Sequence, residues 1–269
     1  MEAKIFEELR EIIYRESGIN LSEEKKQMLM NRLNKRLRKL GLKEPRQYLD
    51  IIETDASGEE LLQLIDVVST NVTYFFRESE HFDYLKSEVF AAYKKQGRDK
   101  VRIWCAASST GEEPYTLAML GSESFSGVRA DVKVLATDIS TRVLNHAVRG
   151  LYQPKQFEKM PQDVVEKYFS AYQDEDETFW KVDPAIASMV TFKRLNLSQF
   201  PYPLKGPLDV IFCRNVMIYF DLQLRTKIIA EMTRLLAPGG YLFLGRSENL
   251  LGIHHDLKGC GASVFRKPK

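Results

Sequence analysis

A buried strand that runs straight into a turn of small residues, and then into a helix, constrains this chain most. The predicted strand is Val101–Ala106, the turn continues to Gly111, and the helix begins near Pro114. Small side chains at the end of a strand allow a ligand to approach the backbone, and strand–turn–helix units of this type bind nucleotides in α/β proteins. The sequence therefore predicts a ligand-binding crevice at this turn.

The acidic start of this helix restricts the ligand. Glu112 and Glu113 occupy the first turn, where a helix favours negative charge. Pro114 is tolerated there because its missing N–H costs little. Two carboxylates repel a phosphate, but they accept a ribose or a cationic amine. The pattern therefore favours S-adenosylmethionine, which carries an α-amino group and a sulfonium but no phosphate, over a dinucleotide.

The pattern of the chain changes near residue 90. Residues 1–90 carry apolar side chains at helical spacing and predict an all-helical N-terminal domain. Residues 91–269 alternate strands with helices, which predicts a parallel sheet covered by helices in a Rossmann-like α/β domain. Within about residues 167–195, the runs Phe179–Val182 and Met189–Phe192 break the alternation and predict an inserted, small antiparallel β-subdomain.

Some local predictions concern the ends of elements. Ser22, followed by Glu23 and Glu24, is predicted to cap the second helix, and Ser140 is predicted to cap the helix that follows Asp138. Near the end of the chain, the run from residue 263 to residue 266 is predicted to be a last, edge strand.

Composition argues against several classes of protein. The net charge of +2 gives no general electrostatic reason to bind nucleic acid. Cys105, Cys213 and Cys260 are far apart and odd in number, so we expect neither a disulfide framework nor a metal site. We find neither a signal peptide nor an apolar run that could span a membrane, so we expect a cytoplasmic protein that does not insert into the bilayer.

Polar residues follow the other predicted strands, whose carboxyl ends meet at one edge of a parallel sheet. Asp138 is predicted to accept hydrogen bonds from ribose hydroxyls, and the alternative is that it caps the next helix. Asn196 follows another strand end, beside the expected adenine region. Arg214 and Asn215 directly follow the apolar strand Leu208–Cys213, although each could instead be an ordinary loop residue.

Five strings of the sequence resemble the chemotaxis receptor glutamate methyltransferases, the CheR family, in the right order and over nearly the whole chain. They are Asn71–Glu78 (NVTYFFRE), Ser109–Tyr115 (STGEEPY), Ala136–Asp138 (ATD), Phe212–Asp221 (FCRNVMIYFD) and Gly245–Asn249 (GRSEN). The resemblance implies a Rossmann-like methyltransferase domain behind a helical domain, with the antiparallel insert as the family's β-subdomain.

The resemblance also implies the chemistry. S-adenosylmethionine would donate a methyl group to receptor glutamates, giving glutamyl methyl esters and S-adenosylhomocysteine, with no metal. Arg77 and Tyr219 would be the catalytic residues that face the reacting carboxylate. The resemblance also implies which residues line the cofactor pocket: Asn71, Thr73, Arg77, Glu112, Glu113, Asp138, Asn196, Leu197, Arg214 and Asn215. It leaves open whether Glu112, Glu113 or both contact the cofactor.

The second helix is strongly basic and indicates a partner surface. Arg32, Lys35 and Arg36 are predicted to attract the acidic cytoplasmic methylation helices of chemotaxis receptors. Charge reversal at Arg32 and Arg36 should then raise KM and weaken its salt dependence. The alternatives are a solvated cationic face and a nucleic-acid surface, although aromatic residues are not interleaved here as nucleic-acid binding would favour.

In some members of the family, the β-subdomain binds a pentapeptide at the receptor's C-terminus through a glycine-containing loop. The corresponding Gln173–Glu177 has no glycine and four consecutive acids, so we expect methylation that is independent of such a tether. We also expect a monomer. Two other functions stay open: methylation of a small molecule or nucleic acid, and a module that only docks receptors. Intact Arg77, Asp138 and Tyr219 argue against the second.

Overall fold

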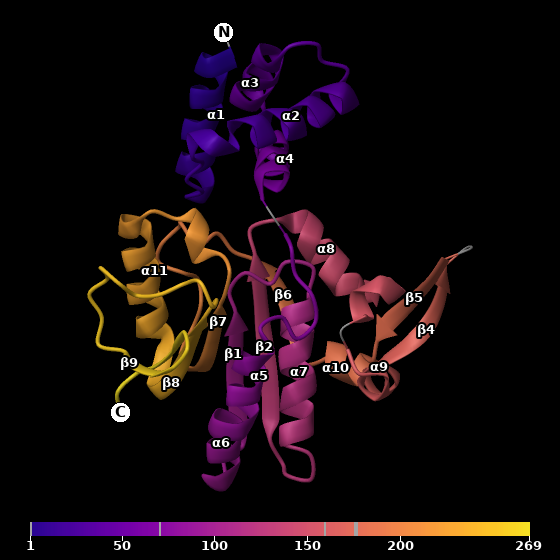
Figure 1. Ribbon diagram of the computed structural model, residues 1–269, viewed down its shortest axis with the longest axis vertical. Coiled ribbons are helices and arrows are strands. Elements are labelled where there is room, and N and C mark those ends of the chain that lie inside the picture. The colour runs from indigo at the N-terminus through magenta and orange to yellow at the C-terminus, as the bar shows by residue number, and fades with distance from the viewer. Residues whose placement is uncertain (1, 70, 159, 175–176) are drawn as a thin grey trace.

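The computed structural model describes residues 2–69, 71–158, 160–174 and 177–269. Its first part is helical, and these helices stack against one end of the rest of the chain (Figure 1). They are α1 (Glu2–Ser17), α2 (Lys26–Leu40), α3 (Pro45–Thr54) and α4 (Glu59–Val68). We call them the helical domain.

Glycine and proline set the ends of these helices, as predicted. Gly41 follows α2 with a φ of 71°, the left-handed conformation that glycine adopts without strain. Pro45 is the first residue of α3, where its fixed φ suits a helix start. The predicted Ser22 cap is wrong, because its side chain makes no capping hydrogen bond. Only the Ser22 carbonyl accepts, from the Lys25 N–H at 2.9 Å within a 3-10 turn.

The remainder is built on a seven-stranded sheet. Five strands run parallel in the order β6-β2-β1-β7-β8, and the antiparallel strands β10 and β9 follow β8. The direction of strand succession reverses between β1 and β7, which is where ligands bind in doubly wound sheets. The strands are β1 (Lys100–Cys105), β2 (Asp131–Asp138), β6 (Val190–Arg194), β7 (Leu208–Cys213), β8 (Leu236–Leu244), β9 (Lys258–Gly261) and β10 (Val264–Arg266). The predicted Rossmann-like fold class is confirmed.

Each face of the sheet has its own apolar core, because successive strand residues point to opposite sides. In β7, Ile211 and Cys213 join a core that continues into α11 and the helical domain. Val210 and Phe212 join the core beneath α5, α6 and α7. The covering helical segments are α5 (Ser79–Tyr84), a π-helical turn (Leu85–Phe90), α6 (Ala91–Lys95), α7 (Glu112–Ser124), α8 (Thr141–Arg149) and α11 (Leu222–Leu235). The domain limit predicted near residue 90 therefore falls inside a segment that packs on the sheet.

A three-stranded antiparallel sheet of order β3-β5-β4 projects from one side (Figure 1). Its strands and neighbouring short helices are β3 (Leu151–Tyr152), a 3-10 turn (Pro154–Phe157), α9 (Gln162–Tyr168), β4 (Phe169–Asp174), β5 (Glu177–Val182) and α10 (Pro184–Ala187). The predicted antiparallel insert therefore exists. The acidic tip expected between β4 and β5 includes residues 175 and 176, which lie outside the described residues.

Two strand predictions are wrong. The run Met189–Phe192 does not belong to the small sheet, because β6 pairs in parallel with β2 in the main sheet. The strand near the C-terminus is not the edge, because β9 lies outside β10. Among the helices of the described ranges, none combines the length and the apolar character needed to cross a membrane.

Candidate active site

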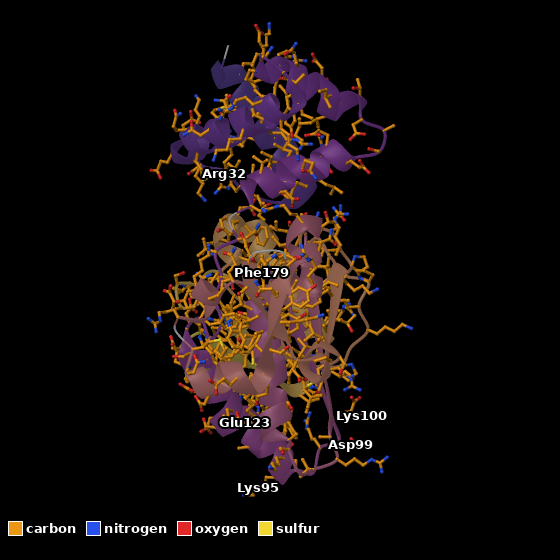
Figure 2. All side chains as sticks on the ribbon, turned by 90° about the vertical axis from the view of Figure 1, so that its right-hand side faces the viewer. Arg32, Lys95, Asp99, Lys100, Glu123 and Phe179 are labelled. Carbon is orange, nitrogen blue, oxygen red and sulfur yellow. The ribbon has the colours of Figure 1, made fainter. Side chains whose placement is uncertain are left out.

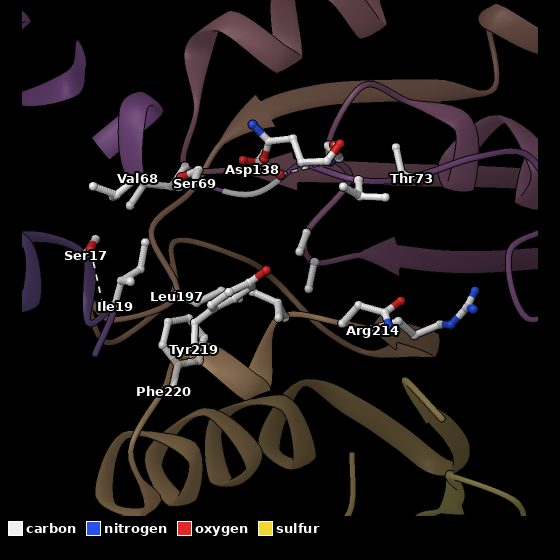
Figure 3. A pocket seen from close by; sticks show the side chains of 18 of the residues that line it. Ser17, Ile19, Val68, Ser69, Thr73, Asp138, Leu197, Arg214, Tyr219 and Phe220 are labelled. Carbon is white, nitrogen blue, oxygen red and sulfur yellow. Dashed lines mark hydrogen bonds between the residues drawn. The ribbon is translucent and has the colours of Figure 1, made fainter. Parts of the chain in front are cut away.

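A cavity lies between the carboxyl edge of the sheet and the helical domain (Figure 3). Its space measures about 1020 Å³ when the open mouth is included. Ala106 and Ala107, just beyond β1, line one wall, so the predicted crevice at the small-residue turn is present. Ser17, Ile19 and Val68 line another wall, so the helical domain helps to enclose the space.

The structure brings most of the predicted site residues together. Nine of the ten residues expected to hold the cofactor line the cavity, and so does Tyr219. The nine are Asn71, Thr73, Arg77, Glu113, Asp138, Asn196, Leu197, Arg214 and Asn215. Residues more than a hundred positions apart thus meet at one edge of the sheet, as parallel strands require.

The two acids at the start of α7 lie in different surroundings. Glu112 does not line the cavity; it is 1% exposed, and its carboxylate accepts from the Thr110 hydroxyl at 2.6 Å and the Gln156 amide at 2.9 Å. Glu113 lines the cavity and accepts from Arg214 Nη1 at 2.9 Å. Burial raises the pKa of both carboxyls. Of the two, Glu113 is the acid positioned to meet a cationic group of a ligand.

Asp138 ends β2 and is 8% exposed. Its Oδ2 accepts from the Ser109 N–H at 2.9 Å, and its Oδ1 accepts from the Ser140 N–H at 3.0 Å. Burial raises the pKa of this carboxyl. Ser140 itself caps α8, as predicted, by accepting the Val143 N–H at 3.3 Å. Each Asp138 oxygen has a second lone pair that can accept from a ribose hydroxyl.

The Arg214 guanidinium is engaged with protein groups. The side chain is 0% exposed. Its Nη1 binds Glu113, and its Nη2 donates to Glu78 Oε2 at 3.1 Å and to the Arg77 carbonyl. Its charged carbon also lies 5.2 Å from the Phe82 ring centroid. Burial of a cation is tolerated only with such compensation, so these bonds tie the end of β7 to the segment before α5 and to the start of α7.

Glu78 was not among the predicted site residues, yet its carboxylate joins three segments. Oε1 accepts from Asn215 Nδ2 at 3.0 Å, and Oε2 accepts from Arg214 and from the Arg246 N–H at 3.0 Å. Burial alone would raise the pKa of Glu78, but the hydrogen bonds from Asn215 and Arg214 lower it to about 2. The acid directly follows Arg77 in a string that resembles the family, which was the available signal.

Backbone strain concentrates around the cavity. Phe76, Glu78, Ser109 and Asn215 have φ values of 57°, 56°, 46° and 58°, in the left-handed region that non-glycine residues avoid. Ser263 is the one further non-glycine example among the described residues. Each such residue costs on the order of 1–3 kcal/mol and persists only where its surroundings fix it. The turns that form this site are therefore held in place by their contacts.

Glu248 is a second residue that the sequence reasoning missed. It is 5% exposed, and its carboxylate accepts three backbone N–H groups, from Asn215 at 2.8 Å, Gly245 at 2.6 Å and Met217 at 2.8 Å. Burial raises the pKa of Glu248, and these bonds oppose the rise. The carboxylate shapes the turn between β7 and α11, which carries Tyr219 into the cavity wall (Figure 3).

The two predicted catalytic residues line the cavity from different segments. Arg77 precedes α5, and its Nη1 donates to the Val72 carbonyl at 2.6 Å. Tyr219 belongs to the turn before α11, and the Lys25 ammonium lies 5.1 Å from its ring centroid. Asn71, which also lines the cavity, offers a hydrogen-bond donor to a ligand, because its Nδ2 is buried and has no partner within the described residues.

Asn196 connects the two parts of the chain. Its Nδ2 donates to the Glu16 carbonyl in α1 at 2.7 Å, and its Oδ1 accepts from the Ser198 N–H at 2.9 Å and hydroxyl at 2.8 Å. The neighbouring Leu197 is 6% exposed. The Asn196 side chain thus holds the helical domain over the cavity.

Two of the three residues of the predicted basic surface, Arg32 and Arg36, have partners within the helical domain, and the attraction of receptor helices by this surface stays a prediction. Arg32 Nη1 donates to the carbonyls of Val67–Ser69 at 3.0, 3.2 and 3.2 Å, so it closes the end of α4 within the helical domain (Figure 2). Arg36 forms a two-point ion pair with Glu60 at 2.8 and 2.6 Å, with both side chains largely buried. Lys35 is exposed. Charge reversal at Arg32 or Arg36 would break these contacts and would not report on partner attraction alone.

The polar groups that line the cavity fit S-adenosylmethionine. A carboxylate at Glu113 suits an amino group, Asp138 suits a ribose, and the orphaned Asn71 amide can donate to a ligand acceptor. Within the ranges that the structure describes, no three His, Cys, Asp or Glu side chains gather in a way that could hold a metal ion.

Two family models match the chain. "CheR methyltransferase, all-alpha domain" matches residues 4–69, and "CheR methyltransferase, SAM binding domain" matches residues 71–265. The chain is 40% identical to the chemotaxis protein methyltransferase of Borreliella burgdorferi, over 91% of this chain and 87% of that protein. It is 36% identical to that of Escherichia coli K12, over 98% and 91%, and 36% identical to chemotaxis protein methyltransferase 2 of Pseudomonas aeruginosa, over 97% and 91%. The chain belongs to the CheR family of S-adenosylmethionine-binding methyltransferases that act in chemotaxis.

Proposed function

We propose that the protein methylates glutamate side chains of chemotaxis receptors, forming glutamyl methyl esters and S-adenosylhomocysteine. The observation that carries the proposal is one cavity whose wall holds acids, Glu113 and Asp138, together with Arg77 and Tyr219. A cationic methyl donor suits the acids. A carboxylate acceptor suits the guanidinium and the phenol, which can both donate hydrogen bonds to it.

The transfer balances without a general base. When bound, S-adenosylmethionine supplies an electrophilic methyl group: one acceptor oxygen bonds to the methyl carbon, and the sulfur–carbon electron pair stays on sulfur. A free glutamate has a pKa of about 4.3, so it is already ionised at neutral pH and no proton needs to move. A carboxylate and a sulfonium become neutral, so exclusion of water by the helical domain favours the reaction.

The chain's own residues would align the reactants. Arg77 holds one acceptor oxygen and Tyr219 directs the other, without either of them forming a covalent bond. Glu113 binds the amino group of the methyl donor, and Asp138 binds its ribose. Alignment of two reactants in a closed site can contribute several kcal/mol toward the barrier, about 7–11 in favourable cases. Catalysis here therefore rests on position and desolvation.

The test uses radiolabelled S-adenosylmethionine and receptor-containing membranes. We expect label on the receptors that alkali releases as volatile methanol, because a carboxyl ester is cleaved by alkali. Label that is alkali-stable, or that appears on a small molecule or nucleic acid instead, contradicts the proposal. Tight docking to receptors without any label would identify a binding module.

Four narrower proposals concern the setting of the reaction. Methylation is independent of a C-terminal pentapeptide on the receptor, because the acidic, glycine-free Gln173–Glu177 departs from the peptide-binding loop of the family. Truncation of the receptor tail should then leave the rate unchanged. The enzyme works in the cytoplasm as a monomer, with the helical domain facing the receptor; sedimentation of the purified protein tests the monomer.

A further inference from the structure

We propose that Glu78 is the positioning residue that holds Arg77 in place for catalysis, acting through Arg214 and Asn215. The inference rests on the proposed function, since Arg77 is the residue assigned to the acceptor carboxylate. Glu78 contacts neither reactant in this scheme. It sets the place of the backbone from which the Arg77 side chain extends.

The backbone on both sides of Arg77 is strained. Phe76 and Glu78 have φ values of 57° and 56°, so Arg77 sits between two left-handed residues. The Arg77 side chain itself has one hydrogen bond, to the carbonyl of Val72, among the contacts described for it. Its direction therefore depends on the path of the backbone, and that path needs contacts that outweigh the strain.

The contacts that fix this path converge on Glu78. Arg214 Nη2 binds both the Arg77 carbonyl and Glu78 Oε2, so one buried cation holds two successive residues. Asn215 Nδ2 binds Glu78 Oε1 at 3.0 Å, and the Arg246 N–H binds Oε2 at 3.0 Å. The segment that carries Arg77 is thus fastened to the ends of β7 and β8, which form the rigid edge of the site.

In this arrangement, both carboxylate oxygens of Glu78 must act as hydrogen-bond acceptors. In Glu78→Gln, the shape is kept, but an NH2 group replaces one oxygen. If the amide oxygen stays toward Asn215, its NH2 meets two donors, Arg214 and the Arg246 N–H. The opposite orientation turns NH2 toward Asn215 Nδ2. Either orientation leaves the buried Arg214 short of one negative partner.

The chain provides a matched control at Glu80. Glu80 lies two residues away and pairs with the Arg246 side chain at the surface, with Arg246 71% exposed. Glu80→Gln is the same chemical change, and it leaves the Arg246 backbone N–H available to Glu78. Surface pairs of this kind contribute little to stability.

The first measurement is methyl transfer to receptor membranes. We expect Glu78→Gln to lower kcat at least tenfold while the Kd for S-adenosylhomocysteine changes less than threefold, with Glu80→Gln unchanged in both. In an Arg77→Lys background, the further loss caused by Glu78→Gln should shrink to less than threefold, because Glu78 acts through Arg77. A full additional loss in that background, or an unchanged kcat in the single variant, overturns the inference.

The second measurement does not depend on turnover. Hydrogen–deuterium exchange of the peptide covering residues 71–78 should accelerate at least tenfold in Glu78→Gln and stay unchanged in Glu80→Gln, while exchange in β1 and β7 stays slow. Acceleration across the whole protein would indicate general destabilisation and overturn the inference. Wild-type protein that transfers no methyl to receptors would refute the proposed function, and the exchange result would still decide whether Glu78 fastens the segment.

Discussion

The side-chain amide of Asn196 donates to the carbonyl of Glu16 at 2.7 Å, across the boundary between the sheet and the helical domain. The two residues lie 180 positions apart in the sequence. Since Ser17 and Ile19 lie one and three residues after Glu16 and line the cavity, this bond helps to set one wall of the proposed cofactor site.

Loss of this bond should weaken cofactor binding. Asn196→Asp keeps the acceptor that Ser198 uses but replaces the donor with an oxygen that repels the Glu16 carbonyl. We expect the Kd for S-adenosylhomocysteine, measured by calorimetry, to rise about tenfold, which corresponds to about 1.4 kcal/mol. Ser198→Ala removes another partner of the same side chain and leaves the connection to α1 intact, so its Kd should stay near that of the wild type. Equal affinities in all three proteins would contradict this role.

The catalytic assignment predicts unequal effects at its two positions. Arg77→Ala should abolish transfer, because the acceptor carboxylate loses its charged partner. Tyr219→Phe should slow transfer moderately, about tenfold or somewhat more, because one hydrogen bond from an uncharged donor to the ionised carboxylate is lost, a contribution of roughly 1.5 kcal/mol or more. Single-turnover kinetics with receptor membranes measure both. Turnover like the wild type in Arg77→Ala would remove Arg77 from the mechanism.

The two neighbouring glutamates of α7 offer a comparison of identical substitutions. Glu113 lines the cavity and Glu112 does not. Glu113→Gln should weaken S-adenosylmethionine binding about tenfold, since a charge-assisted hydrogen bond to an amino group is lost. Glu112→Gln should leave binding unchanged. Calorimetry on the two variants decides the assignment, and the reverse order of affinities would overturn it.

The basic helix α2 contains its own control pair. Arg36→Glu breaks a largely buried ion pair with Glu60 and should destabilise the protein by about 3–5 kcal/mol, measured by urea unfolding. Lys35→Glu alters an exposed side chain and should leave the free energy of unfolding unchanged. If α2 attracts acidic receptor helices, Lys35→Glu raises KM at low salt and flattens its salt dependence. An unchanged KM would show that Lys35 takes no part in attraction.

The low pKa of Glu78 predicts acid sensitivity. The ordinary value is 4.5 and the folded value is about 2, so the folded state binds fewer protons than the unfolded state between these limits. The contribution of Glu78 to stability is therefore fully present above about pH 4.5 and is lost as the pH falls toward 2. Glu78→Gln should flatten this part of the curve of unfolding free energy against pH. Urea unfolding over that range measures it, and identical slopes in the two proteins would contradict the assignment.

The local patterns of the sequence were sufficient for the fold class and for most of the elements. Gly41 and Pro45 mark helix ends, and the apolar run Leu208–Cys213 marks the strand, because these signals act within a few residues. The partner of β6 could not be found in this way. The short run Val190–Arg194 has the composition of a strand, but its pairing with β2 depends on residues more than fifty positions away.

In the site too, residues marked by a local pattern could be predicted, and contacts between distant segments could not. Asp138 and Asn215 could be named because each follows a strand whose end must lie at the ligand edge. The partners of Arg214 could not, since Glu78 and Glu113 are 136 and 101 positions away. The contacts of Arg32 with the end of α4 and of Arg36 with Glu60 could not be predicted for a related reason: charge spacing along a helix does not reveal which neighbouring helix covers each side chain.

The cavity takes its walls from residues within 17–28, 68–69 and 71–77 as well as from the strand ends. An isolated α/β half would therefore present an open shelf in place of an enclosed chamber. On that shelf, water would solvate both the sulfonium and the acceptor carboxylate, and this solvation would have to be lost before the methyl group could move. Shortening the protein to its Rossmann-like half should thus slow methyl transfer even where the donor still binds.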